Sequence, residues 1–205
     1  MKFGIGSSAR VKKYGFLKAH FKKAEFIKII KRYNNKINLI DTAPSYSSAE
    51  KEIGKFSNTK IKIITKISKI KSKNPKSALK EIVFKIKKSL KNLNNKKLYA
   101  LLFHDEKDIF FFKDSYFKKE FNLIKKHFFI NKIGYSTYNI YNFEKNQKIY
   151  KFDIVQLPIN IFFINKKKIE FLKKIKSKYK IELHARSIFL QGLALTNLKL
   201  VPSKL

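Results

Sequence analysis

The sequence predicts an α/β fold of the (β/α)8 TIM-barrel type, and three observations support the prediction. Short apolar runs alternate with lysine-studded helical patterns, which is typical of a parallel sheet covered by helices. Runs such as Tyr99–Phe103 are apolar on both faces, as strands buried on both sides are. Polar residues stand at the ends of successive strands, where barrel enzymes carry their chemistry. We count about seven β/α units, so the predicted barrel is incomplete and its eighth unit is missing.

Seven strands are expected, at Lys2–Gly6, Ile37–Asp41, Lys60–Lys66, Leu98–His104, Lys132–Ser136, Asp153–Pro158 and Ile181–Ala185. Six helices are expected, at Ala24–Tyr33, Glu50–Phe56, Ser77–Leu93, Tyr116–His127, Tyr141–Tyr150 and Lys166–Tyr179. In the third of these, apolar residues recur every three or four positions from Ala78 to Leu93 and line one face. Gly4–Ala9 matches the dinucleotide pattern GxGxxG/A, but a poor helix pattern follows it, so we treat the match as accidental.

Composition limits the class of protein. The 205 residues are one domain's worth of chain, so a single domain is expected over residues 1–205. A hydrophobic content of 44% excludes a disordered chain. The absence of cysteine excludes disulfides and thiolate metal sites and fits a cytoplasmic protein. No run approaches the ~18 apolar residues of a membrane span, so no membrane partner is expected.

The formal net charge of +34 in isolation suggests a polyanion as partner. Of the 48 basic residues, however, only Arg10, Arg32 and Arg186 are arginines and the other 45 are lysines spread along the whole chain. Base-reading proteins depend on arginine for bidentate contacts, and AT-biased codon usage accounts for a chain rich in Lys, Asn, Ile and Phe. We therefore do not expect nucleic acid as a partner, although a basic polyanion binder stays an alternative.

Polar side chains follow five of the expected strands at the point where each strand ends. They are Asp41, Lys66, His104, Ser136 and Gln156. Each has a structural interpretation of its own, because strand ends and loops are polar in most proteins. In a barrel, however, all five would converge on one mouth. Their order along the chain therefore favours an active site over five unrelated surface residues.

Six segments of the chain resemble motifs of the aldo-keto reductase family, and the resemblance covers essentially the whole sequence. Ile40–Gly54 is similar to the signature D-T-A-x-x-Y-G-x-x-E-x-x-L-G, with Ser47 in place of its first glycine. The other segments are Thr65-Lys66 (T-K), Leu102–Asp105 (L-x-H-D), Gly134–Ser136 (G-V-S), Gln156–Asn160 (Q-x-x-x-N) and Ala185–Gly192.

The resemblance implies roles for four catalytic residues. Tyr46 would donate the proton that a carbonyl needs when a nicotinamide cofactor reduces it. Lys66 would be the cation beside Tyr46, Asp41 would hold Lys66, and His104 would orient the substrate carbonyl. A nearby ammonium suits this chemistry because it favours the phenolate form of a tyrosine.

The resemblance also implies a cofactor, NADPH with NADH as the alternative. Ser136 and Gln156 would bind its nicotinamide amide, and Ser187 is a third expected cofactor contact. No metal is expected, because the sequence shows no zinc-ligand spacing and its four histidines, at 20, 104, 127 and 184, are scattered.

The expected function is NAD(P)H-dependent reduction of a small aldehyde or ketone, with a sugar-like compound as the suggested substrate. A full barrel of this type needs ~250 residues, so we expect a C-terminally truncated member that lacks strand eight and the family's cofactor clasp. For this reason a catalytically silent relative, acting as a binding or scaffold protein, stays open as the alternative. The expected oligomeric state is a monomer or a weak homodimer.

Overall fold

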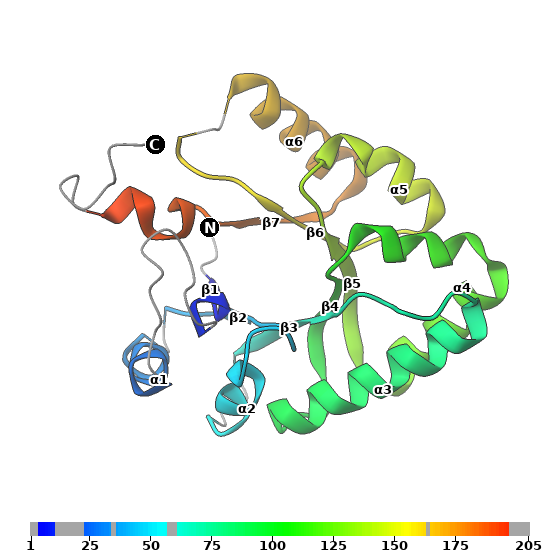
Figure 1. Ribbon diagram of the computed structural model, residues 1–205. Coiled ribbons are helices and arrows are strands. Elements are labelled where there is room, and N and C mark those ends of the chain that lie inside the picture. The colour runs from blue at the N-terminus through cyan, green and yellow to red at the C-terminus, as the bar shows by residue number, and fades with distance from the viewer. Residues whose placement is uncertain (1–3, 11–22, 34–35, 57–60, 163–164, 197–205) are drawn as a thin grey trace.

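The computed structural model describes residues 4–10, 23–33, 36–56, 61–162 and 165–196, and within them seven parallel strands form one curved sheet (Figure 1). Each strand pairs with its neighbours in the chain, in the order β1 to β7. The strands are β1 (Gly4–Gly6), β2 (Leu39–Asp41), β3 (Lys62–Ile67), β4 (Leu98–Phe103), β5 (Ile130–Ser136), β6 (Ile154–Pro158) and β7 (Glu182–Arg186). The sheet is a nearly closed (β/α)8-type barrel with seven of its strands, as predicted.

Helices alternate with the strands and lie on the outer face of the sheet (Figure 1). They are α1 (Lys23–Arg32), α2 (Ala49–Gly54), α3 (Pro75–Leu93), α4 (Ser115–His127), α5 (Phe143–Ile149) and α6 (Lys166–Tyr179). Short 3₁₀ helices are η1 (Ser8–Arg10), η2 (Glu106–Lys113), η3 (Ile140–Asn142) and η4 (Leu190–Leu195). All six expected helices are confirmed to within a few residues. Helix α3 begins at Pro75 because the Asn74 side chain accepts a hydrogen bond from the Ser77 amide and caps the first turn.

The apolar core has two parts, because successive residues of a strand face opposite sides of the sheet. The larger part lies between the strands and the outer helices, where Phe112 packs edge-on against Phe103 and Phe121 at ring-centroid distances of 5.5 and 4.9 Å. The smaller part comprises Ile64, Ala100, Leu102 and Ile154 from the three strands β3, β4 and β6. Since Leu102 pairs with Lys66 in the ladder, this second cluster adjoins the strand ends that carry the polar residues.

Two glycines in the motif segments are required by close packing. A Cβ atom on Gly134 would lie 2.1 Å from the carbonyl oxygen of Ile154 on β6, and one on Gly54 would lie 2.2 Å from the carbonyl oxygen of Asn92 on α3. Neither contact leaves room for any side chain. These positions therefore determine how β5 approaches β6 and how α2 approaches α3.

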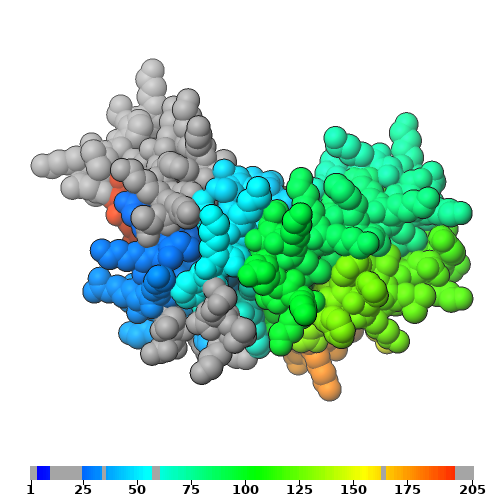
Figure 2. All heavy atoms as spheres, turned by 90° about the horizontal axis from the view of Figure 1, so that it is seen from below, coloured from blue at the N-terminus to red at the C-terminus, as the bar shows by residue number. Residues whose placement is uncertain are grey.

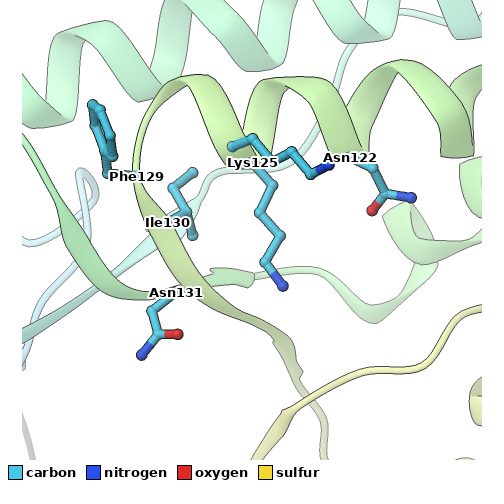
Figure 3. A pocket seen from close by; sticks show the side chains of 6 residues that line it. Asn122, Lys125, Phe129, Ile130 and Asn131 are labelled. Carbon is cyan, nitrogen blue, oxygen red and sulfur yellow. The ribbon is translucent and has the colours of Figure 1, made fainter.

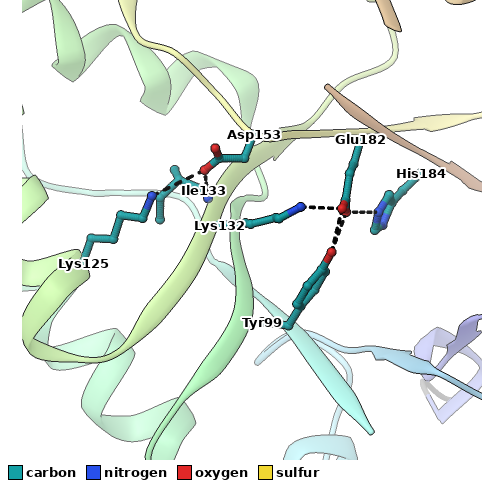
Figure 4. A network of polar contacts seen from close by, with 7 residues as sticks. All are labelled: Tyr99, Lys125, Lys132, Ile133, Asp153, Glu182 and His184. Carbon is teal, nitrogen blue, oxygen red and sulfur yellow. Dashed lines mark hydrogen bonds and ion pairs between the residues drawn. The ribbon is translucent and has the colours of Figure 1, made fainter. Parts of the chain in front are cut away.

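A polar network joins the amino-terminal halves of three strands (Figure 4). The Glu182 carboxylate of β7 accepts hydrogen bonds from Tyr99 Oη on β4 at 2.7 and 2.8 Å and from Lys132 Nζ on β5, and His184 Nε2 lies 3.2 Å from it. Burial alone would raise the pKa of Glu182, but these hydrogen bonds outweigh it and lower that pKa to about 2. The network therefore links the last described strand to the centre of the sheet.

At least eleven of the fourteen carboxylates accept hydrogen bonds from partners in the described part of the fold: Asp41, Glu50, Glu52, Glu81, Asp105, Glu106, Asp108, Asp114, Glu144, Asp153 and Glu182. The lysines, in contrast, are mostly half-buried or exposed, so the outer surface is strongly basic. Figure 2 shows part of this surface, on which side chains coloured from blue through green to yellow-green lie next to one another. Among the described residues, no helix has the length and apolar character needed to cross a membrane.

Candidate active site

The carboxyl ends of β2, β3 and β4 bring three predicted site residues to one mouth. Asp41 is the last residue of β2, Lys66 the last but one of β3, and His104 follows β4 directly. The amide of His104 donates to the carbonyl oxygen of Ile67 at 3.0 Å, which extends the ladder by one residue and fixes the backbone there. Because the strands are parallel and adjacent, all three side chains project from the same end of the barrel.

Lys66 and Asp41 form the centre of this mouth. Lys66 Nζ lies 2.7 and 2.8 Å from the two carboxylate oxygens of Asp41 and 3.0 Å from the carbonyl oxygen of Thr42, and its side chain is 1% exposed. Burial lowers the pKa of Lys66 from its usual range, although the Asp41 carboxylate opposes this effect. The three oxygens satisfy all three donors of an ammonium group, so Lys66 is held in one orientation.

Tyr46 reaches this pair from the loop between β2 and α2. Its amide donates to the Ala43 carbonyl oxygen at 3.0 Å, which forms a turn, and Ser47 then takes a left-handed conformation with φ of 54° before α2 begins. The Tyr46 ring centroid lies 5.1 Å from Lys66 Nζ. The ring meets that of His104 edge-on at 6.1 Å and 87°. The ring of Tyr46 thus lies beside both an ammonium group and an imidazole.

His104 stands in an environment that disfavours its charged form. Burial lowers its pKa below the usual 6.5, and the positive charge of Lys66 lowers it further. The imidazole is therefore neutral at neutral pH, with one nitrogen able to donate a hydrogen bond and the other able to accept one.

Gln156 and Ser136 extend the site to β6 and β5, where they pair with each other in the ladder. Gln156 Nε2 donates to Asp41 Oδ1 at 3.1 Å, which connects β6 with the Lys66–Asp41 pair. Because only the amide nitrogen can donate to a carboxylate, this bond also fixes which way the amide points. Among the described residues nothing donates to Gln156 Oε1, which is buried. The mouth thus contains a buried acceptor in need of a donor.

Ser187, the third residue expected to contact a cofactor, lies one position beyond β7. It has a left-handed backbone conformation with φ of 57°, and its carbonyl oxygen accepts from the Leu190 amide at 2.9 Å. It therefore belongs to the turn that precedes η4, at the same end of the barrel as the other site residues.

Sequence reasoning missed three residues that take part in or support the site. Ser7 Oγ, just after β1, donates to Thr42 Oγ1 at 2.8 Å. Glu50 of the signature segment is buried and accepts from Thr65 Oγ1 at 2.7 Å, so it positions the loop that carries Tyr46. Arg186 ends β7, and its charge acts on Lys66 and His104. Its position at a strand end was the available signal, since Arg186 follows the same pattern as Asp41 and Lys66.

The hollow shown in Figure 3 lies elsewhere, between the end of α4 and the start of β5. It has a volume of about 580 Å³ and is lined by Asn122, Lys125, Lys126, Phe129, Ile130 and Asn131. This is the amino-terminal end of the strands, opposite to the mouth. The lining contains no acid–base pair, so it is not a candidate for the chemistry.

The sequence model described as Aldo/keto reductase family matches residues 3–200. No curated protein matches the sequence significantly. Among solved structures, the holo form of an aldo-keto reductase from Bacillus halodurans superposes with a TM-score of 0.72 at 17% identity, covering 98% of this chain and 66% of that one. A glycerol dehydrogenase from Gluconobacter oxydans gives a TM-score of 0.69 at 18% identity, covering 98% of this chain and 64% of its own.

A third structure, a mutant of Gox0644 in complex with NADPH, gives a TM-score of 0.65 at 16% identity and covers 96% of this chain and 66% of the other. The chain thus spans about two thirds of the length of these structures. At such low identity they show a shared fold and nothing finer. The family match, in contrast, runs over nearly every residue and includes the segments that build the mouth, so this chain belongs to the aldo/keto reductase family.

Proposed function

We propose that the protein reduces a small aldehyde or ketone to the alcohol with NAD(P)H. The observation that carries the proposal is the position of Tyr46, whose ring lies 5.1 Å from the buried Lys66 ammonium and edge-on to His104. A hydroxyl that can give a proton, a cation that stabilises the resulting phenolate and a neutral hydrogen-bonding imidazole are the groups that carbonyl reduction requires.

In this proposal each residue has one task. Tyr46 Oη donates its proton to the carbonyl oxygen as negative charge develops there. The positive charge of Lys66 favours the phenolate that is left, and Asp41 keeps Lys66 in place through both carboxylate oxygens. His104, neutral because burial lowers its pKa, donates a hydrogen bond to the same carbonyl oxygen and orients it.

The residues at β5 and β6 fit a nicotinamide cofactor, which supplies the hydride when bound. Gln156 Oε1 is buried and, within the described part of the chain, accepts no hydrogen bond, so it suits the amide N–H of a carboxamide. Ser136 and Ser187 are proposed as further contacts at the same end of the barrel. We propose NADPH as the preferred donor because a structural neighbour was solved with NADPH, and a hydroxylated, sugar-like carbonyl as substrate because another is a glycerol dehydrogenase.

The test is NADPH oxidation with a panel of aldehydes, in the wild type and in Tyr46→Phe. Without its acid, the variant should lose about 10²- to 10⁴-fold in kcat. It should bind NADPH with unchanged affinity, because the phenyl ring and its contacts remain. Tyr116→Phe, at an exposed position on α4, is the matched control and should behave as the wild type.

Two outcomes would contradict the proposal. Undiminished turnover in Tyr46→Phe would remove Tyr46 from its role. A folded wild type that binds NADPH but reduces none of the aldehydes would favour the catalytically silent alternative.

A further inference from the structure

Arg186 is a cation at the mouth whose partner is missing from the described chain. It ends β7, pairs with Pro158 of β6 and lies at the same end of the barrel as Lys66 and His104. Its Nε atom is buried, and no described residue accepts a hydrogen bond from it. Leaving a buried donor of a charged group unsatisfied is costly. The site therefore favours a ligand that can accept from this guanidinium.

The guanidinium is held in place by a tyrosine ring. Its Cζ atom lies 4.4 Å from the ring centroid of Tyr138, a residue that is 82% exposed. Stacking uses the face of the planar group and leaves the N–H donors at its edge free. A stacked arginine can therefore bind an oxyanion with two parallel hydrogen bonds, a geometry that lysine cannot provide.

The charge balance of the mouth points to an anion as well. Asp41 is the carboxylate that contacts Lys66, and Lys66 and Gln156 already use its oxygens. Across the residues that the structure describes, Arg186 forms no ion pair. Its positive charge instead disfavours the protonated forms of Lys66 and His104, and so contributes to the lowered pKa of both. The mouth thus holds the two cations Lys66 and Arg186 beside the carboxylate of Asp41, while Asp105, whose charge also acts on His104, caps the first turn of η2.

We propose that Arg186 binds an anionic group of the substrate, so that the preferred substrates are carbonyl compounds bearing a carboxylate or a phosphate. This inference rests on the proposed function, because it names the substrate class of the same site. The anion would neutralise the second cation of the mouth and satisfy its unpaired donors, while the carbonyl of the same molecule lies at Tyr46 and His104. Arg186 is thereby a specificity-determining residue and takes no part in proton transfer.

The first test compares para-carboxybenzaldehyde with its methyl ester, which has nearly the same shape and no charge. In the wild type, kcat/KM should be about ten- to a hundredfold higher for the acid, the range expected for hydrogen bonds to a charged group. Arg186→Met should abolish this preference by bringing the ratio of kcat/KM for the acid to kcat/KM for the ester down to about one, and Arg186→Lys should restore part of it. Arg32→Met is the matched control, since Arg32 also lies over a tyrosine ring, that of Tyr33, but at an exposed position at the end of α1.

The second test measures equilibrium binding of para-(hydroxymethyl)benzoate, the alcohol product, by calorimetry in the absence of turnover. Arg186→Met should weaken its binding by a similar factor, and Arg32→Met should leave it unchanged.

If the wild type reduces neither aldehyde but this loss of binding is seen, the proposed function fails and the anion site stands. Equal kcat/KM for acid and ester would overturn the anion site while leaving carbonyl reduction intact. A third outcome would also overturn it: Arg186→Met binds NADPH more weakly but keeps the wild-type ratio of kcat/KM for acid and ester. Arg186 would then bind an anionic group of the cofactor and not of the substrate.

Discussion

Lys66 shows how a single residue can combine a structural role with the chemical role that we propose for it. An isolated buried ammonium costs several kcal/mol, so it persists only with a partner of opposite charge and a full set of hydrogen bonds. Asp41 and the Thr42 carbonyl oxygen provide these, and the same contacts aim the charge at Tyr46. The residue types at the strand ends therefore depend on one another, and losing either partner of the pair affects folding as well as chemistry.

This dependence predicts a strong coupling between Asp41 and Lys66 in stability. Asp41→Asn leaves the buried ammonium without its counter-charge and should lower the free energy of unfolding by about 3 kcal/mol. Lys66→Met should lower the free energy of unfolding by less, because the Asp41 side chain is 19% exposed and can regain water. The double variant should be more stable than the sum of the two losses implies. Urea unfolding of all four proteins measures this, and additive losses would show that the pair is not coupled.

His104 predicts a pH dependence of stability whose sign follows from its lowered pKa. The folded protein disfavours the imidazolium, whereas the unfolded chain takes up a proton at a pKa of about 6.5. The contribution of His104 is therefore complete above about pH 6.5 and is lost as the pH falls towards the folded pKa, by up to about 1.4 kcal/mol per pH unit. Urea unfolding from pH 7.5 to 5.5 should show a steeper loss in the wild type than in His104→Gln. His127→Gln, at an exposed position, should keep the wild-type slope.

At the scale of elements, hydrophobic periodicity predicted the long helices well and the irregular ones poorly. The expected bounds of α6 coincide with those observed, because a repeating apolar face and a capping asparagine are both local signals. The 3₁₀ helix η2 was missed, since three consecutive phenylalanines show no helical period and only the cap by Asp105 marks its start. Strand ends predicted five of the site residues for the same local reason. Arg186 also ends a strand, but its contact with Tyr138, which lies in another loop, could not be predicted from a pattern confined to one segment.

The Glu182 network predicts that β7 is held to the sheet by electrostatics as well as by its ladder. The pKa of Glu182 is lowered from 4.5 to about 2, so its contribution is complete above about pH 4.5 and is lost as the pH falls towards 2. Because this side chain is 35% exposed, solvent screening reduces the contribution to about 1–2 kcal/mol. Glu182→Gln should lower the free energy of unfolding by that amount at pH 7, and the difference from the wild type should shrink between pH 4.5 and 2. Glu170→Gln, on the exposed face of α6, should change the free energy of unfolding little at either pH.

At the scale of the whole molecule, the sheet is well covered at its centre and sparsely covered at both edges. Every residue of β4 except Tyr99 is buried, whereas none of the β7 residues is fully buried. Of the three β1 residues, two are exposed. Within the described residues, β1 and β7 each pair with one neighbour, so one edge of each strand presents backbone groups without a ladder partner. The most stable part of the fold is therefore β3 to β6 with their helices.

The decrease in burial from the central strands to the edge strands leads to a prediction for amide hydrogen exchange. Amides of β4 and β5 should exchange only through global unfolding, whereas those of β1 and β7 should open locally at a lower free energy and exchange faster at pH 7. Exchange measured by mass spectrometry over peptides of single strands would resolve the two classes. Glu182→Gln should accelerate exchange in β7 more than in β4, because it releases the end of the sheet from Lys132 and Tyr99. Protection of β7 equal to that of β4 would contradict the gradient, and it would mean that a segment outside the described residues, or a second copy of the chain, pairs with this edge.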